Sequence, residues 1–107
     1  MKLVLILVAL STFLLAEISI VYVKKDGCGF CKKQEVIFNK ECTKDPSLYT
    51  KIQVFNKTID IIPPIYRTDW YPSIYIKDGN NSVYTFYGLT TCDNIKLVID
   101  DYKQMSE

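Results

Sequence analysis

The chain has 107 residues, of which 49% are hydrophobic, so it can build one modest domain with its own core and has no room for a second. Its 13 basic and 12 acidic residues leave a formal charge of +1, which provides no basic surface for nucleic acid. The lack of histidine excludes Ser-His-Asp hydrolysis, Cys-His proteolysis and His-ligated metal sites, so the 4 cysteines are the main candidates for chemistry.

The N-terminus has the parts of a signal peptide. Lys2 precedes an apolar run from Leu3 to Leu15, and Ala16 is an acceptable residue before a cleavage site. The run is too short for a comfortable membrane span. We therefore expect residues 1–16 to be a signal peptide and residues 17–107 to form a domain exported to the periplasm or another extracytoplasmic space, without membrane contact after cleavage. An uncleaved membrane anchor is the competing interpretation.

The first half of the remaining chain predicts a strand, a helix and a second strand. Ile18 to Val23 is a β-branched run that is typical of a buried strand. Between Cys31 and about Lys40, apolar residues lie among polar ones, which predicts a helix with one apolar side. Asp45-Pro46-Ser47 ends this helix, and Tyr49 to Phe55 alternates well enough to be the second strand.

The second half predicts a short helix, a hairpin and a last helix. Pro63 and Pro64 mark the start of the short helix. Ser73 to Ile76 and Ser82 to Tyr87 are strands around Asp78-Gly79-Asn80-Asn81, a strong hairpin signal. Thr90 or Thr91 then caps a helix in which apolar positions recur at helical spacing, namely Ile95, Val98, Ile99 and Tyr102.

The most informative motif is Cys28-Gly29-Phe30-Cys31, between the first strand and the first helix. Two thiols three positions apart at a helix start can close a small ring, and the first faces unpaired N–H groups and the positive end of the helix dipole. This position stabilises a thiolate, so Cys28 is the candidate nucleophile. Cys31 lies one turn further in and is the candidate resolving thiol. Gly29 and Phe30 complete the redox loop and add no charge to it.

Further landmarks give the chain a resemblance to the thioredoxin superfamily. Pro64-Ile65-Tyr66, Pro72 eight residues after Pro64, and Gly88 sixteen after Pro72 are similar to thioredoxin landmarks in type and spacing. The resemblance implies an α/β, thioredoxin-like fold: a central four-stranded mixed sheet with strand order 2-1-3-4, flanked by helices and lacking the N-terminal strand and helix of full thioredoxins. Among relatives, the chain looks most like small exported thiol:disulfide interchange proteins.

The resemblance also implies a substrate-binding edge. A cis bond at Tyr71-Pro72 would aim backbone groups of Tyr71 at an extended substrate beside the thiol, and Gly88 belongs to the same edge. Trp70 and Tyr71 would form an aromatic rim for a polypeptide, although core packing is an equally good interpretation of Trp70. The implied partners are protein thiols and disulfides and a redox-recycling protein. No cofactor and no metal are implied, and we expect a monomer.

Two positions depart from the thioredoxin pattern. Tyr22 stands where thioredoxins keep a buried acid, and Gln53 stands where they keep a lysine. The relay that deprotonates the resolving thiol is therefore in doubt. A water molecule or the phenol of Tyr22 could replace it.

Cys42 and Cys92 allow two interpretations. Cys42 falls on one helical stripe with Cys31 and Phe38, so we expect an apolar core thiol. A Cys42–Cys92 disulfide suits an exported chain with an even cysteine count. A helix from Cys31 to Cys42 is about 16 Å long, however, and Cys92 is expected near the active-site edge, so we predict that the two do not pair.

The resulting hypothesis is an exported thiol:disulfide oxidoreductase that acts through Cys28 and Cys31. The alternative from another class is a non-catalytic binding or delivery module whose two thiols hold a soft metal such as Cu(I) or Zn. A third interpretation is an interaction domain in which the motif is a permanent disulfide.

Overall fold

The computed structural model describes residues 17–106. In chain order the elements are β1 (Ile18–Lys24), α2 (Gly29–Lys40), a 3₁₀ turn (Cys42–Lys44), α3 (Pro46–Tyr49), β2 (Ile52–Asn56), a second 3₁₀ turn (Pro64–Tyr66), β3 (Ser73–Asp78), β4 (Asn81–Tyr87) and α4 (Cys92–Ser106). The predicted signal peptide, residues 1–16, lies outside the described residues. Within residues 17–106 no helix has the length and apolar character that crossing a membrane requires.

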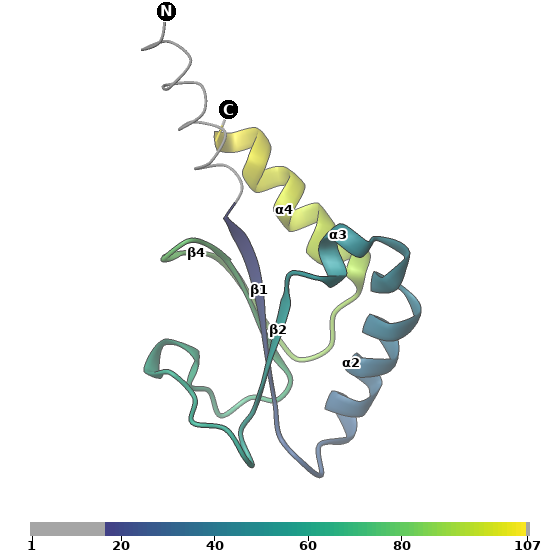
Figure 1. The fold of residues 1–107 in the computed structure, drawn as a ribbon, viewed down its shortest axis with the longest axis vertical. Coiled ribbons are helices and arrows are strands. Elements are labelled where there is room, and N and C mark those ends of the chain that lie inside the picture. The colour runs from purple at the N-terminus through teal and green to yellow at the C-terminus, as the bar shows by residue number, and fades with distance from the viewer. Residues whose placement is uncertain (1–16, 107) are drawn as a thin grey trace, which may run out of the picture.

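The strands form one mixed sheet in the order β2-β1-β3-β4, which confirms the predicted order (Figure 1). β1 runs parallel to β2 and antiparallel to β3, and β3 and β4 form an antiparallel hairpin. The hairpin turn is Gly79-Asn80, and Gly79 has a φ of 59°, a left-handed conformation that glycine adopts without strain. The strands extend through Asp78 and Asn81, further than the sequence predicted.

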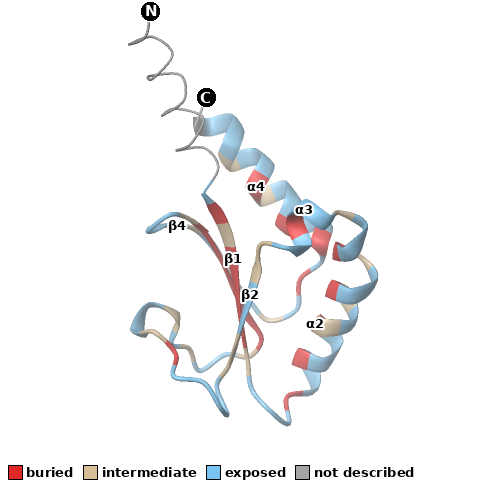
Figure 2. Cartoon of the chain, in the orientation of Figure 1, coloured by how far each residue is buried: buried red, intermediate tan, exposed pale blue. Residues whose placement is uncertain are grey.

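Alternation along β1 gives the sheet two apolar faces. Ile18, Ile20 and Tyr22 belong to the core on one side, whereas Val21 and Val23 belong to a smaller cluster on the other. α2 and α4 cover the first face, where Phe38 and Ile95 complete the core (Figure 1). The buried positions of both helices lie toward the sheet and their exposed positions lie toward solvent (Figure 2).

The chain between β2 and β3 covers the second face of the sheet. Ile62 is buried there against Val21, Val23 and Tyr75, with Phe55, Tyr66 and Tyr71 packed around them. The Tyr66 ring stacks on Phe55 at 6.0 Å and contacts Tyr75 at 5.3 Å between centroids. The predicted short helix is a single 3₁₀ turn at Pro64–Tyr66, and it anchors the loop that leads to Tyr71.

The region after α2 differs from the prediction. Tyr49 is not in β2, because Asp45 caps a new helical turn, α3, by accepting a hydrogen bond from the Leu48 N–H at 3.4 Å. Pro46 occupies the first position of that turn, where its lack of an N–H costs nothing. The sequence Asp45-Pro46-Ser47 thus ends one helix and begins another, and β2 starts at Ile52.

The prediction that Cys42 and Cys92 do not pair is wrong. They form a disulfide with a Cα–Cα distance of 5.4 Å, and both are buried. The error lies in the path of the chain before α4. Thr90 lies beside the middle of α2, where its N–H and C=O exchange hydrogen bonds of 2.9 and 3.0 Å with Gln34. The extended segment therefore delivers Cys92 to the C-terminal end of α2, away from the Cys28–Cys31 motif.

Candidate functional site

Cys28 and Cys31 lie at the start of α2 and form a disulfide with a Cα–Cα distance of 5.2 Å. Cys28 is the N-cap residue, and its Sγ accepts a hydrogen bond from the Cys31 N–H at 3.1 Å. Within the described residues, the first turn of α2 carries no acidic side chain that would destabilise a thiolate at Cys28. Cys28 keeps 9% of its surface exposed against 1% for Cys31, so the two sulfurs differ in access.

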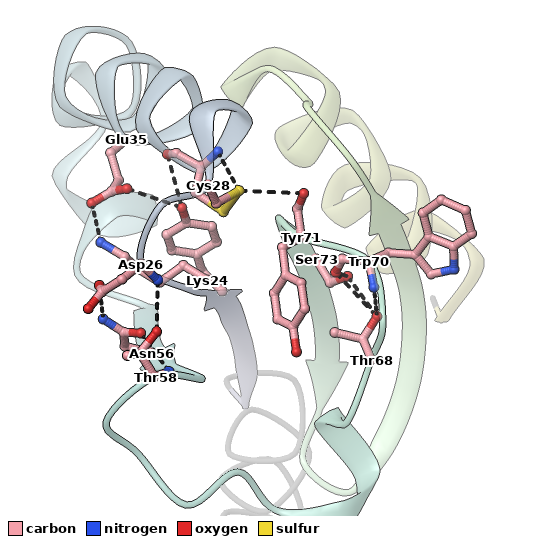
Figure 3. The surroundings of a disulfide bond; sticks show 12 residues. Lys24, Asp26, Cys28, Glu35, Asn56, Thr58, Thr68, Trp70, Tyr71 and Ser73 are labelled. Carbon is pink, nitrogen blue, oxygen red and sulfur yellow. Dashed lines mark hydrogen bonds and ion pairs between the residues drawn. A yellow bond between two sulfur atoms is a disulfide. The ribbon is translucent and has the colours of Figure 1, made fainter.

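The loop before Cys28 is fixed to the loop after β2. The Asp26 N–H donates to Thr58 Oγ1 at 2.9 Å, and the Asn56 amide donates to Asp26 Oδ1 at 3.0 Å (Figure 3). Gly27 follows with a φ of 76°, a conformation that other residues rarely adopt. These contacts hold the approach to the N-terminus of α2, and no sequence pattern predicted them.

Tyr71 and Pro72 lie against the disulfide. The Tyr71-Pro72 bond is cis, as expected, and the carbonyl oxygen of Tyr71 lies 3.7 Å from Cys28 Sγ (Figure 3). Pro72 is fully buried, and its carbonyl accepts a hydrogen bond from the Gly88 N–H at 2.8 Å. Gly88 has a φ of 101°, so its glycine identity serves the backbone conformation of this edge. The structure thus brings Cys28, Tyr71, Pro72 and Gly88 together.

The aromatic residues of the predicted rim have different positions. Trp70 is 69% exposed, so the core-packing interpretation of this residue is wrong, but its indole points away from Cys28 (Figure 3). Phe30 is 58% exposed and follows Gly29 in the first turn of α2, with Lys33 Nζ 5.4 Å from its ring centroid. The Tyr71 ring has Lys25 Nζ at 5.1 Å from its centroid. Tyr71 therefore contacts Cys28 through its backbone carbonyl, Phe30 lies within the motif, and Trp70 points away from it.

Tyr22 was singled out in the sequence, but its contacts with Glu35 and Lys24 beneath the site were not. The Tyr22 hydroxyl lies 3.1 Å from the Cys31 carbonyl oxygen and 3.4 Å from Glu35 Oε2. Lys24 Nζ forms an ion pair with Glu35 Oε1 at 2.7 Å (Figure 3). Burial, reinforced by the charge of Glu35, raises the pKa of Tyr22. An available signal was the position of Glu35, four residues after Cys31 and so on the same helix face.

Residues 17–106 bring together no group of three or more Cys, His, Asp or Glu side chains of the kind that holds a metal ion.

No family model matches the chain, and no curated protein is a significant match to it. Solved structures do resemble it. The periplasmic thioredoxin SoxS from Paracoccus pantotrophus is 15% identical with a TM-score of 0.58, covering 85% of this chain and 100% of its own. Thioredoxin f2 from Chlamydomonas reinhardtii is 16% identical with a TM-score of 0.63, covering 80% of this chain and 79% of its own. Plasmodium falciparum thioredoxin is 25% identical with a TM-score of 0.56, covering 80% and 82% respectively. The chain therefore has the thioredoxin fold, as the sequence predicted.

Proposed function

We propose that this chain is a thiol:disulfide oxidoreductase that exchanges disulfides with protein substrates through Cys28 and Cys31. The observation that carries the proposal is the position of Cys28 Sγ at the N-cap of a 12-residue helix, 3.1 Å from a backbone N–H, with Cys31 within bonding distance. A helix N-terminus stabilises a thiolate, and a second thiol one turn away can displace whatever the first has captured. The thioredoxin fold of the chain agrees with this use of the pair.

The reduction of a substrate disulfide would take two balanced steps. The Cys28 thiolate attacks one substrate sulfur, a bond forms between Cys28 and that sulfur, and the other substrate sulfur leaves with the electron pair. Cys31 then loses its proton and attacks Cys28, which releases the first substrate sulfur as a thiolate and forms the Cys28–Cys31 disulfide. The substrate gains two electrons and the protein loses two. Oxidation of a dithiol substrate is the reverse sequence.

The Tyr71 edge is suited to an extended polypeptide. Its carbonyl lies beside Cys28 Sγ, where it can accept a hydrogen bond from a substrate backbone placed next to the reacting sulfur. Phe30 supplies exposed apolar surface beside the motif. Because Trp70 points away from Cys28, it would contact only a substrate that extends past the immediate site (Figure 3).

The proposal includes export to an oxidising compartment. The Cys42–Cys92 disulfide supports this part, because structural disulfides persist mainly outside the reducing cytosol. The apolar run before Ala16 is the corresponding signal in the sequence. Edman sequencing of the protein secreted by its host would find Glu17 at the N-terminus if the run is removed after Ala16.

The proposed function is tested by trapping. A Cys31→Ala variant should accumulate mixed disulfides through Cys28, since attack still occurs and the resolving thiol is gone. Cys28→Ala should trap nothing, and Cys42→Ala/Cys92→Ala should behave as the parent does. Adducts are detected on non-reducing gels of host extracts and identified by mass spectrometry. Failure of Cys31→Ala to form Cys28-linked adducts with any protein would contradict the proposal.

The direction of electron flow requires a separate measurement. Equilibration of the Cys28–Cys31 pair with glutathione buffers gives its reduction potential. A value near about −270 mV would assign a reductant, and one near about −120 mV would assign an oxidant.

A further inference from the structure

The resolving step requires Cys31 to lose a proton in a buried place. Cys31 is 1% exposed, so bulk water reaches its side chain poorly. The buried acid that thioredoxins keep in this region is replaced by Tyr22, and the lysine by the exposed Gln53. If the proposed function holds, on which this inference rests, some other group has to carry the proton away from Cys31.

Tyr22 is in position to be that group. Its side chain is 1% exposed, and its hydroxyl lies 3.1 Å from the carbonyl oxygen of Cys31. The ring is fixed by an edge contact with Phe38, 5.1 Å between centroids, so the hydroxyl is held at the base of the motif. A phenol both donates and accepts hydrogen bonds and can therefore pass a proton on.

The second contact of Tyr22 leads to solvent. Its hydroxyl lies 3.4 Å from Glu35 Oε2, and the other Glu35 oxygen is held by Lys24 Nζ at 2.7 Å. The Glu35 side chain is 38% exposed in this ion pair. A surface hollow of about 270 Å³ opens beside it, and its lining residues are Tyr22, Glu35, Phe38, Asn39, Tyr49, Ile52 and Val54. Tyr22 and Glu35 therefore form a line of polar groups from the base of the motif to water.

We propose that Tyr22 and Glu35 form the proton path by which Cys31 is deprotonated when it resolves a mixed disulfide. The Cys31 Sγ proton reaches the Tyr22 oxygen through one bridging water molecule, the hydroxyl proton of Tyr22 passes to Glu35, and Glu35 releases it to water in the hollow. The Cys31 thiolate attacks Cys28 Sγ, the bond between Cys28 and the substrate sulfur breaks, and the substrate leaves as a thiolate that solvent protonates. Lys24 is a positioning residue, because it holds the Glu35 carboxylate toward Tyr22.

The electrostatics agree with a path in which the phenol stays neutral. Because burial and the Glu35 charge raise the pKa of Tyr22, the phenol keeps its proton at neutral pH and conducts without becoming an anion. The titratable groups that the structure places around this path are Tyr22 and Lys24 from β1, Glu35 from α2 and Tyr49 from α3. The β2 residues on the hollow, Ile52 and Val54, do not ionise.

The test separates the two steps of exchange. The reduced full chain is mixed in a stopped-flow instrument with the chromogenic disulfide dithiobis(nitrobenzoate). Attack by Cys28 releases one thiolate in a phase whose rate depends on reagent concentration, and attack by Cys31 releases the second in a phase that does not. Tyr22→Phe, Glu35→Gln and the parent are compared from acidic to alkaline pH. Tyr49→Phe is the matched control, since its phenol lines the same hollow and bonds Asn39 instead of Cys31.

We expect Tyr22→Phe and Glu35→Gln to slow the second phase about a hundredfold at neutral pH, at the lower end of general acid-base effects. The deficit should shrink at high pH, where hydroxide removes the proton without a relay, and the first phase should stay at the parental rate. Tyr49→Phe should match the parent in both phases. A second phase within twofold of the parent in both variants at every pH would overturn the relay alone. Absence of the first phase in the parent would overturn the proposed function, and the relay with it.

Discussion

The two disulfides lie at opposite ends of α2 and differ in both loop length and burial. Cys28–Cys31 spans 3 positions at the helix start, and Cys28 keeps 9% of its surface exposed. Cys42–Cys92 spans 50 positions just past the helix end, where the two residues are 0% and 3% exposed. An attacking thiolate needs access to a sulfur, so only the first bond is placed for exchange. The second constrains the chain.

Because the two disulfides lie at opposite ends of α2, the helix can stay in place when its reactive Cys28–Cys31 bond opens. Opening the Cys28–Cys31 bond frees only a four-residue loop, and the helix remains attached to α4 by Cys42–Cys92 and by the two hydrogen bonds of Gln34 with Thr90. The C-terminal half of α2 is thus the fixed part, and the N-terminal turn can change redox state. Four predictions test this contrast.

The largest expected effect is on exchange. Cys28→Ala should reduce a model disulfide peptide no faster than buffer does, because the nucleophile is gone. Cys42→Ala/Cys92→Ala should keep the parental rate at a temperature where it is folded. The measurement is the rate of peptide thiol release, with circular dichroism to check folding. Loss of exchange in a folded double variant would show that the second disulfide takes part in the reaction.

The second prediction is that Cys42–Cys92 contributes more to stability than Cys28–Cys31, the reverse of their order for exchange. Closing a loop of 50 residues restricts the unfolded chain strongly, so Cys42→Ala/Cys92→Ala should lower the free energy of unfolding by about 4 kcal/mol. Cys28→Ala/Cys31→Ala should lower it by about 2 kcal/mol, since that loop is short. Urea titrations of the oxidised proteins give both values. Equal losses in the free energy of unfolding would show that Cys42–Cys92 is not the more stabilising of the two disulfides.

The third prediction concerns the polar link between α2 and the chain before α4. Gln34→Met keeps the side-chain volume but leaves the buried N–H and C=O of Thr90 without these partners, at a cost of about 2 to 3 kcal/mol. Gln53→Met on exposed β2 is the matched control and should change stability by less than about 0.5 kcal/mol. Urea titration again provides the measurement. A Gln34→Met variant as stable as the control would mean that another group satisfies Thr90.

Much of this arrangement could be predicted from sequence. The strand order, the hairpin, the cap of α4 at Thr91 and the placement of Cys28 at a helix start all follow from local pattern or from the thioredoxin landmarks. These features depend on residues close together in sequence or at a spacing shared with a known fold. The exposure of Trp70 could not be decided, because an aromatic residue in a loop suits core and surface equally well.

The errors and omissions involve contacts between distant segments. The Cys42–Cys92 bond depends on the route of the residues between Gly88 and Cys92, which carry no local pattern that specifies it. The Glu35–Lys24 pair joins a helix to a strand, and each residue alone looks like an ordinary surface charge. α3 was missed because Asp45-Pro46-Ser47 is as typical of a helix end as of a helix start.

The smallest expected effect is a pH dependence at the fixed end of α2. A hydrogen bond from Ser47, with further contributions from Leu48 and Lys96, lowers the pKa of Asp45 in the folded chain. A carboxyl whose folded pKa lies below its unfolded value of about 3.9 stabilises the fold above that pH, and this contribution is lost as the pH falls through the folded pKa. Asp45→Asn keeps a good N-cap but does not titrate, so its urea midpoint should fall less steeply than that of the parent below about pH 4. Asp101→Asn, on an exposed turn of α4, is the control and should follow the parent. Parallel acid profiles for the parent and Asp45→Asn would show that this carboxyl contributes nothing to holding α3 against the buried disulfide.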